Sequence, residues 1–252
     1  MAEFIEGKRP VNEALRNNVP VRRLYVAEGL KKDKVVTEIT KRCHKRGISV
    51  KQVSRHELDK LSERGSHQGL MLETESFQYS STKEIIIAAK KRAEANDGCA
   101  LIVVLDHITD AGNLGAIARS AEVVGASGIL IPANRSVKVT AATYKSSAGA
   151  IANIPVARVA GIPQVIDTLK ENDFWVAGAS EKAKDCIWDA NMAGKIALVM
   201  GSEGEGLARL TMERCDFLVG LPQAGTIGSL NVAQAATACM YEWMRQCTRG
   251  RK

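Results

Sequence analysis

Residues 100–131 read ALIVVLDHITDAGNLGAIARSAEVVGASGILI, and this stretch indicates the fold of the chain. It begins with a continuous apolar strand at 100–105 and ends with a second at 128–131, with a helical segment between them. Strands that are apolar on both faces are typical of a parallel sheet covered by helices on both sides. Further strands are predicted at residues 174–177, 196–200 and 217–219, so the larger part of the chain is an α/β domain.

The first 76 residues show a shorter alternation of strands and helices. Strands are predicted at 22–27, 48–53 and 69–74, and an amphipathic helix at 34–46 ends at Gly47. Ser54 is expected to cap a short helix, and a threonine cap at Thr82 is expected for a helix over 82–95. The predicted organisation is a small α/β domain over 1–76, a linker and connecting helix over 77–97, and a larger α/β domain over 98–252.

The positive charge of the chain is concentrated at one end. Of a formal net charge of +7, all belongs to residues 1–70, which contain 16 Lys and Arg against 9 Asp and Glu. This asymmetry favours a polyanionic partner, nucleic acid before membrane, although a solvated basic surface would look the same. No apolar run approaches the roughly 18 residues of a membrane span, and residues 1–10 lack a secretory signal pattern. We therefore expect a cytoplasmic protein with no membrane association.

The cysteines and histidines show no metal-binding spacing. No C-x-x-C pair occurs, and the four histidines are not clustered with cysteines. We expect no metal ion, and free, reduced, mostly buried thiols. The six cysteines are Cys43, Cys99, Cys186, Cys215, Cys239 and Cys247.

Three loops follow predicted strands, and ligands of parallel sheets bind in such loops beyond the carboxyl ends of the strands. The first, residues 106–115, leads into a helix with Asn113 at its start and Arg119 farther along. A helix amino terminus favours an anion such as phosphate. The alternative is that Asn113 only caps the helix and Arg119 lies on the surface.

The second loop, residues 201–207 (GSEGEGL), is dense in glycine and lets backbone amides approach a ligand closely. It lacks the Lys-Ser/Thr pair of a P-loop and the G-x-G-x-x-G spacing of dinucleotide-binding folds. The strand at 100–105 is followed by D-A-G-N-L-G, which argues against a nicotinamide dehydrogenase. A nucleoside-type ligand and an ordinary tight turn both remain open.

The third loop, residues 221–231 (LPQAGTIGSLN), precedes a long helix that extends to about Gln246. Small residues are frequent in this helix, among them Ala233, Ala235 and Ala236. They allow close backbone approach to the loops beneath or to a second subunit, or they only fill the core.

Together, NLGAIARSAEVVGA, LVMGSEGEGL and LPQAGTIGSLNVAQA resemble, in order and spacing, the three motifs of the SpoU (TrmH) family of SPOUT RNA 2′-O-methyltransferases. The resemblance covers about residues 98–247. Residues 1–76, with the run Gly65–Gly69 (GSHQG), look like the amino-terminal substrate-binding domain of that family. The layout is most similar to bacterial enzymes that methylate a guanosine of 23S ribosomal RNA.

The resemblance implies a parallel α/β SPOUT domain with a carboxyl-terminal trefoil knot, a homodimer, and S-adenosylmethionine as methyl donor without a metal. The chain departs from the usual pattern at Ala111, where proline is common, at 223–225 (QAG) and at 233–234 (AQ). The catalytic positions that match are Asn113, Arg119, Glu203, Ser229 and Asn231. The matching donor-binding positions are Gly201, Ser202, Gly204, Gly206, Leu221, Gly225, Ser229 and Leu230.

The function that we expect is methyl transfer to a ribose 2′-hydroxyl of structured RNA, with a guanosine of 23S ribosomal RNA as the specific target. Alternatives are a tRNA methyltransferase, methylation of a different 23S site that confers antibiotic resistance, and a non-catalytic RNA-binding factor of ribosome assembly. In the family, an arginine at the position of Arg119 is proposed as the base. A guanidinium is effectively always protonated in proteins, so contact with phosphate and with developing oxyanion charge is a second reading. Glu203 either orients Arg119 or accepts the proton, and the sequence leaves these schemes open.

Overall fold

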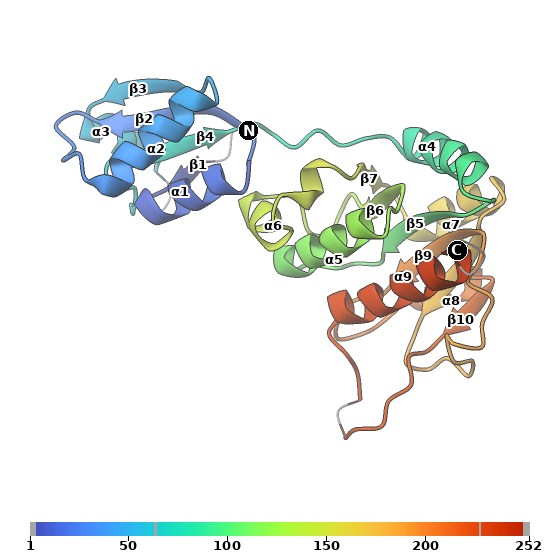
Figure 1. Ribbon diagram of the computed structural model, residues 1–252. Coiled ribbons are helices and arrows are strands. Elements are labelled where there is room, and N and C mark those ends of the chain that lie inside the picture. Colours follow the sequence, from blue (N-terminus) through green and yellow to red (C-terminus); the bar gives the residue numbers. More distant parts are fainter. Residues whose placement is uncertain (1–3, 63–64, 227, 249–252) are drawn as a thin grey trace.

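The computed structural model describes residues 4–62, 65–226 and 228–248. It contains two sheets, each with its own helices, joined by an extended segment (Figure 1). The N-terminal sheet has the order β1-β4-β2-β3, in which β4 is antiparallel to both β1 and β2, and β2 is parallel to β3. Its elements are β1 (Phe4–Glu6), α1 (Lys8–Arg16), β2 (Val21–Ala27), α2 (Lys34–Lys45), β3 (Ser49–Val53), α3 (Arg55–Leu61) and β4 (Leu70–Thr74).

The second sheet has six strands in the order β10-β8-β9-β5-β6-β7, and all of its strand pairs are parallel. The predicted parallel α/β domain is thereby confirmed, whereas β1, α1 and β7 were not expected from the sequence. The trefoil knot implied by the resemblance stays a prediction. The elements are α4 (Thr82–Ala95), β5 (Ala100–Leu105), α5 (Ala111–Val123), β6 (Gly128–Pro132), α6 (Ala141–Ser146), η1 (Ala150–Ala152), β7 (Val156–Val159), α7 (Ile162–Lys170), β8 (Trp175–Ala179), β9 (Lys195–Met200), α8 (Arg209–Arg214), β10 (Phe217–Val219) and α9 (Val232–Thr248).

Helices cover the six-stranded sheet on both faces (Figure 1). In β5, Leu101, Val103 and Leu105 pack in the cluster that contains α5 and α9, while the alternate residues pack in the cluster that contains α4 and α7. Every residue of β5 is buried, which is why its sequence is apolar throughout. Within the described residues, no helix is long and apolar enough to cross a membrane.

The segment between the two sheets is docked on the second domain. The rings of Phe77 and Tyr79 lie edge to face with centroids 5.0 Å apart, and Phe77 also contacts Tyr144 of α6. The Tyr79 hydroxyl accepts a hydrogen bond from the backbone N–H of Val139, and Ser80 pairs with Ala157 of β7. These contacts tie the segment to the edge of the six-stranded sheet.

The amino-terminal cap of α4 differs from the prediction. Ser81, not Thr82, caps the helix: its hydroxyl accepts from the N–H of Glu84, and the Glu84 carboxylate accepts from the N–H of Ser81. Thr82 is the first helical residue. Three consecutive residues, Ser80 to Thr82, have hydroxyl side chains that can cap, and the glutamate three residues after Ser81 completes a capping box for that register.

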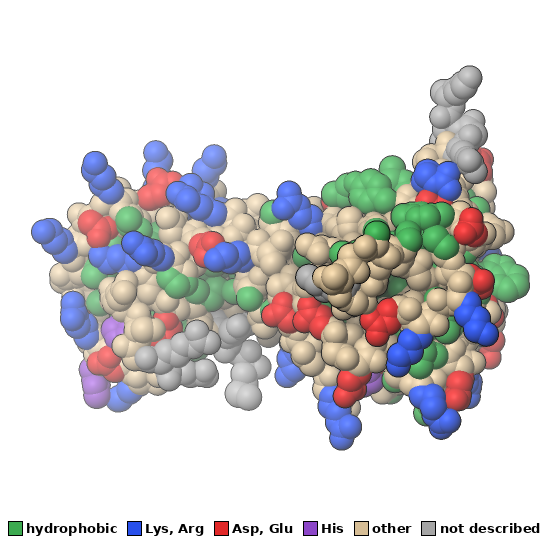
Figure 2. All heavy atoms as spheres, turned by 90° about the horizontal axis from the view of Figure 1, so that it is seen from below, with side chains coloured by type: hydrophobic (Ala, Val, Ile, Leu, Met, Phe, Trp, Pro, Cys, Tyr) green, Lys and Arg blue, Asp and Glu red, His purple; other side chains and the backbone are tan. Residues whose placement is uncertain are grey.

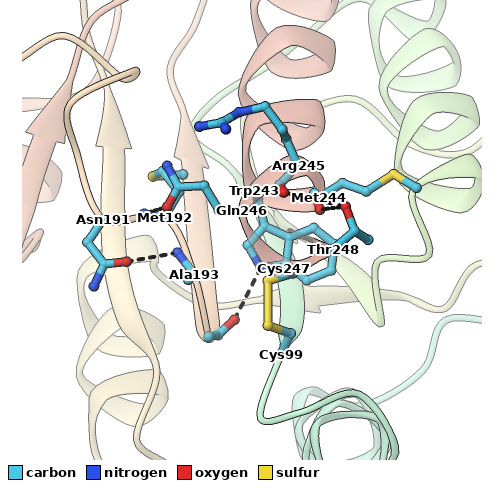
Figure 3. Close-up of a disulfide and its surroundings, with 11 residues drawn as sticks. Cys99, Asn191, Met192, Ala193, Trp243, Met244, Arg245, Gln246, Cys247 and Thr248 are labelled. Carbon is cyan, nitrogen blue, oxygen red and sulfur yellow. Dashed lines mark hydrogen bonds between the residues drawn. A yellow bond between two sulfur atoms is a disulfide. The ribbon is translucent and has the colours of Figure 1, made fainter. Parts of the chain in front are cut away.

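The prediction that all six cysteines are free thiols was wrong for two of them. Cys99 and Cys247 form a disulfide between the start of β5 and the last turn of α9, with their Cα atoms 6.2 Å apart (Figure 3). Beside it, Trp243 donates a hydrogen bond to the carbonyl of Gly194 and Gln246 accepts one from the N–H of Met192. The two cysteines are 148 residues apart, so only the fold brings them together.

Candidate functional site

Residues 201–207, the glycine loop, leave β9 and fold back on themselves. The backbones of Ser202 and Gly206 exchange two hydrogen bonds of 3.0 Å. A Cβ atom on Gly201 would collide with the backbone of Gly206 and Leu207, and Gly206 has a φ of +69°. The loop therefore needs glycine at both positions, and this explains the glycine density seen in the sequence.

Asp106, the residue after β5, holds the two ends of the glycine loop together. Its backbone N–H donates to the carbonyl of Met200 at 2.8 Å, and its carboxylate accepts from the N–H of Ala208 at 2.9 Å. Asp106 is 1% exposed. A buried carboxylate needs such a partner, and the positions just before and just after the loop are held by the backbone and the side chain of one residue.

A cavity of about 310 Å³ lies between the glycine loop and the third loop. We call it the glycine-loop cavity; its size is within the range of small-molecule sites, roughly 300–1,000 Å³. Seven of the eight predicted donor-binding residues line it, and Gly225 does not. The lining residues include Met200, Gly201, Ser202, Gly204, Gly206, Leu207, Val219, Leu221, Ser229 and Leu230.

Three of the five predicted catalytic residues form a hydrogen-bonded group, which we call the Asn–Glu–Asn cluster: Asn113, Glu203 and Asn231. The side-chain amides of Asn113 and Asn231 both donate to Oε1 of Glu203, at 2.7 and 2.6 Å, and Asn231 also donates to Oδ1 of Asn113 at 3.0 Å. The cluster joins the three loops. In the sequence, Asn113 is 90 residues from Glu203 and 118 residues from Asn231. Ser229, a fourth catalytic candidate, lies in the lining of the glycine-loop cavity.

Asn113 does not cap α5, which was the alternative reading. Asp110 is the cap, and its carboxylate accepts from the N–H of Asn113 at 2.7 Å. The amide of Asn113 is therefore available to Glu203. The Oδ1 atom of Asn231 accepts from the N–H of Ala233, so Asn231 both starts α9 and belongs to the cluster.

Arg119, the fifth catalytic candidate, is not brought into the cluster. It is an exposed residue of α5, and within the described residues no hydrogen bond or ion pair joins it to Asn113, Glu203 or Asn231. It lines neither the glycine-loop cavity nor the cavity beside it.

That neighbouring cavity, of about 320 Å³, shares Ser202–Glu205 with the glycine-loop cavity, and we call it the His107 cavity. Its other lining residues are His107, Ile108, Thr109, Asp110, Asn113 and Arg135. It is polar, in contrast to the apolar leucines and valines of the first cavity. Asn113 and Glu203 thus face a second space in which another ligand can be bound next to the first.

Sequence reasoning missed Asp106, His107 and Arg135. The available signal was an ionisable pair directly after a fully apolar strand, at the edge of the sheet where ligands bind. Within the described residues, no group of three or more His, Cys, Asp or Glu side chains could hold a metal ion.

Residues 100–241 match the SpoU rRNA Methylase family, and residues 4–80 match the domain described as RNA 2′-O ribose methyltransferase substrate binding. The chain belongs to the SpoU family. The first match contains all three loops, the Asn–Glu–Asn cluster and both cavities, and the second contains the whole N-terminal sheet.

Relatives that match nearly the whole chain support this membership. A protein of Bacillus subtilis named as a putative TrmH family tRNA/rRNA methyltransferase is 37% identical, over 97% of this chain and 96% of the relative. An uncharacterised tRNA/rRNA methyltransferase of Mycolicibacterium vanbaalenii is 39% identical, over 97% of this chain and 76% of the relative. The crystal structure of the SpoU methyltransferase AviRb from Streptomyces viridochromogenes with its cofactor AdoMet has a TM-score of 0.72 at 26% identity, over 99% of this chain and 92% of that one.

The predicted family is confirmed, and the chain is an RNA methyltransferase of the SpoU family. The roles of the individual site residues stay predictions. So does the closer similarity to enzymes that act on a guanosine of 23S ribosomal RNA.

Proposed function

We propose that this SpoU-family enzyme transfers the methyl group of S-adenosylmethionine to a ribose 2′-hydroxyl of structured RNA, with a guanosine of 23S ribosomal RNA as its target. The observation that carries the proposal is the position of the Asn–Glu–Asn cluster, since Glu203 lines both cavities and Asn113 lines the second. A donor in one cavity and an acceptor in the other would meet at this cluster.

The glycine-loop cavity suits a nucleoside with an attached amino acid. Leu207, Leu221 and Leu230 provide apolar surface for an adenine ring, and the backbone of Gly201–Gly206 can approach the ligand closely because it carries few side chains. When bound, S-adenosylmethionine supplies an activated methyl group on a sulfonium. The protein then has to align the acceptor oxygen and manage its proton.

The His107 cavity suits the acceptor nucleotide. Its polar lining includes the guanidinium of Arg135, which can contact phosphate or a base edge, beside the amide of Asn113. Arg119 lines neither of the two cavities of its own chain, so we assign it to a phosphate of the RNA that extends beyond the acceptor nucleotide.

The N-terminal domain is proposed to bind the RNA. Figure 2 shows Lys and Arg side chains spread over this domain, which lies at the left of that view. On its sheet, Arg23 and Lys51 lie over the ring of Tyr25, at 5.8 and 5.9 Å from the ring centroid. Because Tyr25 is buried beneath them, the surface offers cations for phosphate and not an open ring for base stacking, which favours a folded RNA over a single strand.

The enzyme is also proposed to be a homodimer through α5 and α9. These helices pack on each other, with Ser120 of α5 hydrogen-bonded to Thr237 of α9, and Val123 and Tyr241 are 59% and 49% exposed on them. Figure 2 shows hydrophobic side chains gathered along the upper edge of the second domain, the side on which these helices lie. Arg119 is one helical turn from Val123, and would therefore lie beside the second copy. Sedimentation of the full chain tests the dimer.

Methylation mapping tests the proposed reaction. The full chain is incubated with isotopically labelled S-adenosylmethionine and unmodified transcripts of 23S ribosomal RNA and tRNA, and nucleoside mass spectrometry locates the label. We expect 2′-O-methylguanosine in the 23S transcript and none in tRNA. Label on tRNA alone would mean that tRNA, and not 23S ribosomal RNA, is the substrate. Label on a base would mean that the enzyme does not methylate ribose. No label, although the donor binds, would favour a non-catalytic RNA-binding factor.

A further inference from the structure

Asp106 and His107 form a carboxylate–imidazole pair at the edge of the His107 cavity. Oδ1 of Asp106 is 2.5 Å from Nδ1 of His107. The Asp106 side chain is 1% exposed and that of His107 is 49% exposed, so the carboxylate is buried beneath a ring that reaches the cavity. The other carboxylate oxygen of Asp106 is engaged by the N–H of Ala208, which fixes the carboxylate in place.

This contact decides which ring nitrogen of His107 is available. A carboxylate held at Nδ1 favours the tautomer that has its proton there, and leaves Nε2 as a hydrogen-bond acceptor. His107 also has a left-handed backbone, with φ of +59°. Such conformations in residues other than glycine are uncommon and concentrate at functional sites, where the surrounding structure holds them.

The other groups near the acceptor are less suited to take a proton. Oε1 of Glu203 already accepts two amide hydrogen bonds from the cluster, so this oxygen is engaged. Arg119 cannot accept a proton because its guanidinium is already protonated. Among the other ionisable side chains of the cavity, Asp110 caps α5 and Arg135 is a cation.

We propose that His107, oriented by Asp106, is the proton acceptor for the ribose hydroxyl, a role that rests on the proposed function. As the acceptor oxygen forms its bond to the methyl carbon, the carbon–sulfur electron pair returns to sulfur and the hydroxyl proton passes to Nε2 of His107. The Asp106 carboxylate stabilises the imidazolium that results, and the half-exposed ring releases the proton to water. This is the arrangement by which a carboxylate orients a catalytic histidine in other enzymes.

The charged groups that contact His107 or line the same cavity are Asp106 beneath it, Asp110 on its own loop, Glu203 and Glu205 on the glycine loop, and Arg135. A histidine base accepts a proton only when its ring is neutral. The wild-type rate should therefore fall toward acid pH.

The test compares the wild-type chain with His107→Asn, whose side chain tolerates a left-handed backbone and can still donate to Asp106. Single-turnover methylation of the 23S transcript, with donor and RNA saturating, should be slower by about 100-fold or more, as for loss of a general base. The residual rate should lose the acid-side fall of wild type. His44→Asn, at an exposed histidine of α2, is the matched control and should keep both the rate and the pH profile.

A second measurement detects contact between His107 and the target hydroxyl in the wild-type chain, without methyl transfer and without a substitution. With histidines labelled by ¹⁵N, the Nε2 resonance of His107 in the full chain should shift on binding RNA with a free target 2′-hydroxyl, and less on binding the 2′-deoxy RNA. Asp106→Asn keeps an acceptor for Ala208 but removes the charge, and should slow transfer when donor and RNA are saturating. A wild-type rate and pH profile in His107→Asn, or equal shifts with both RNAs, would overturn the role of His107. A wild-type chain that methylates neither transcript would overturn the proposed function and this role with it.

Discussion

Burial keeps three thiols of this chain protonated. It raises the pKa of Cys43 to about 11 and those of Cys215 and Cys239 to about 12. The thiolate is the reactive form, so these cysteines should be poor nucleophiles near neutral pH. In the unfolded chain, thiols ionise from their ordinary pKa of 9.0, so the stabilising contribution of these groups is present below that pH and is lost as the pH rises above it.

Alkylation of the native chain at about pH 8 should therefore label Cys186, which is partly exposed, and leave the buried Cys43 and Cys239 unmodified. Cys215 is also partly exposed, but its raised pKa keeps the thiol protonated, so it should react much more slowly than Cys186. Cys99 and Cys247 should be labelled only after reduction, because they form the disulfide. Peptide mass spectrometry with and without reductant gives the pattern, and the unfolded reduced chain, with all six labelled, is the control. Labelling of Cys99 and Cys247 without reductant would mean that the disulfide is absent in solution.

Site residues that belong to a sequence motif could be predicted from the sequence. The role of a residue could not be predicted where it depends on a partner that is distant in the sequence. Asn113, Glu203 and Asn231 were named from loop motifs, and they meet in one cluster. Which of Asp110 and Asn113 caps α5 was not predictable, because both can cap and the amide of Asn113 is used by Glu203, 90 residues away. The Asp106–His107 contact was hidden for a related reason, since it depends on the left-handed backbone of His107.

In the glycine loop, adding one methyl group at Gly201 should disturb the structure and weaken donor binding. Gly201→Ala places a Cβ against the backbone of Gly206 and Leu207, which cannot rotate away as a side chain could. Overpacking of this kind costs about 1–3 kcal/mol, and here it would displace the lining of the glycine-loop cavity. We expect S-adenosylmethionine to bind at least about tenfold more weakly, as measured by calorimetry.

Gly204→Ala is the comparison variant within the same loop. No heavy atom lies within 4 Å of the added Cβ, so its effect on donor affinity should be much smaller than that of Gly201→Ala. Equal losses in the two variants would indicate that loop flexibility, and not the close approach at Gly201, sets the affinity. Binding of the donor by Gly201→Ala as tightly as by wild type would argue against donor binding in this cavity.

Elements with a strong period or a fully apolar run were predicted. Of the four edge strands, β3 and β10 were predicted, whereas β1 and β7 were missed. The strands at 100–105 and 196–200 lie side by side in the middle of the six-stranded sheet, where burial on both faces requires apolar residues. In β7, at the edge, Arg158 interrupts the apolar pattern. The three-residue β1, at the edge of the smaller sheet, is too short to show a period.

For the whole molecule, the charge distribution supports the proposed roles of the two domains. The excess of basic residues lies in the N-terminal domain, and the candidate site lies in the loops of the second sheet. The docked segment from Phe77 to Ser80 connects them, and Lys145 of α6 forms an ion pair with Glu13 of α1. RNA held by the first domain would thus be presented to a site at a defined position.

Charge reversal on the N-terminal sheet should weaken RNA binding without affecting the donor. In Arg23→Glu/Lys51→Glu, two proposed phosphate contacts are lost, and each contributes about one unit to the slope of log affinity against log salt. The steepness of the salt dependence of RNA binding should fall by about two, and the affinity for RNA at low salt should also fall. The affinity for S-adenosylmethionine, measured by calorimetry, should be unchanged. Lys83→Glu/Lys91→Glu on α4 makes the same change in net charge on the other domain. If that control weakens RNA as much, total charge and not this sheet attracts the RNA, and the proposed role of the N-terminal domain in binding is wrong.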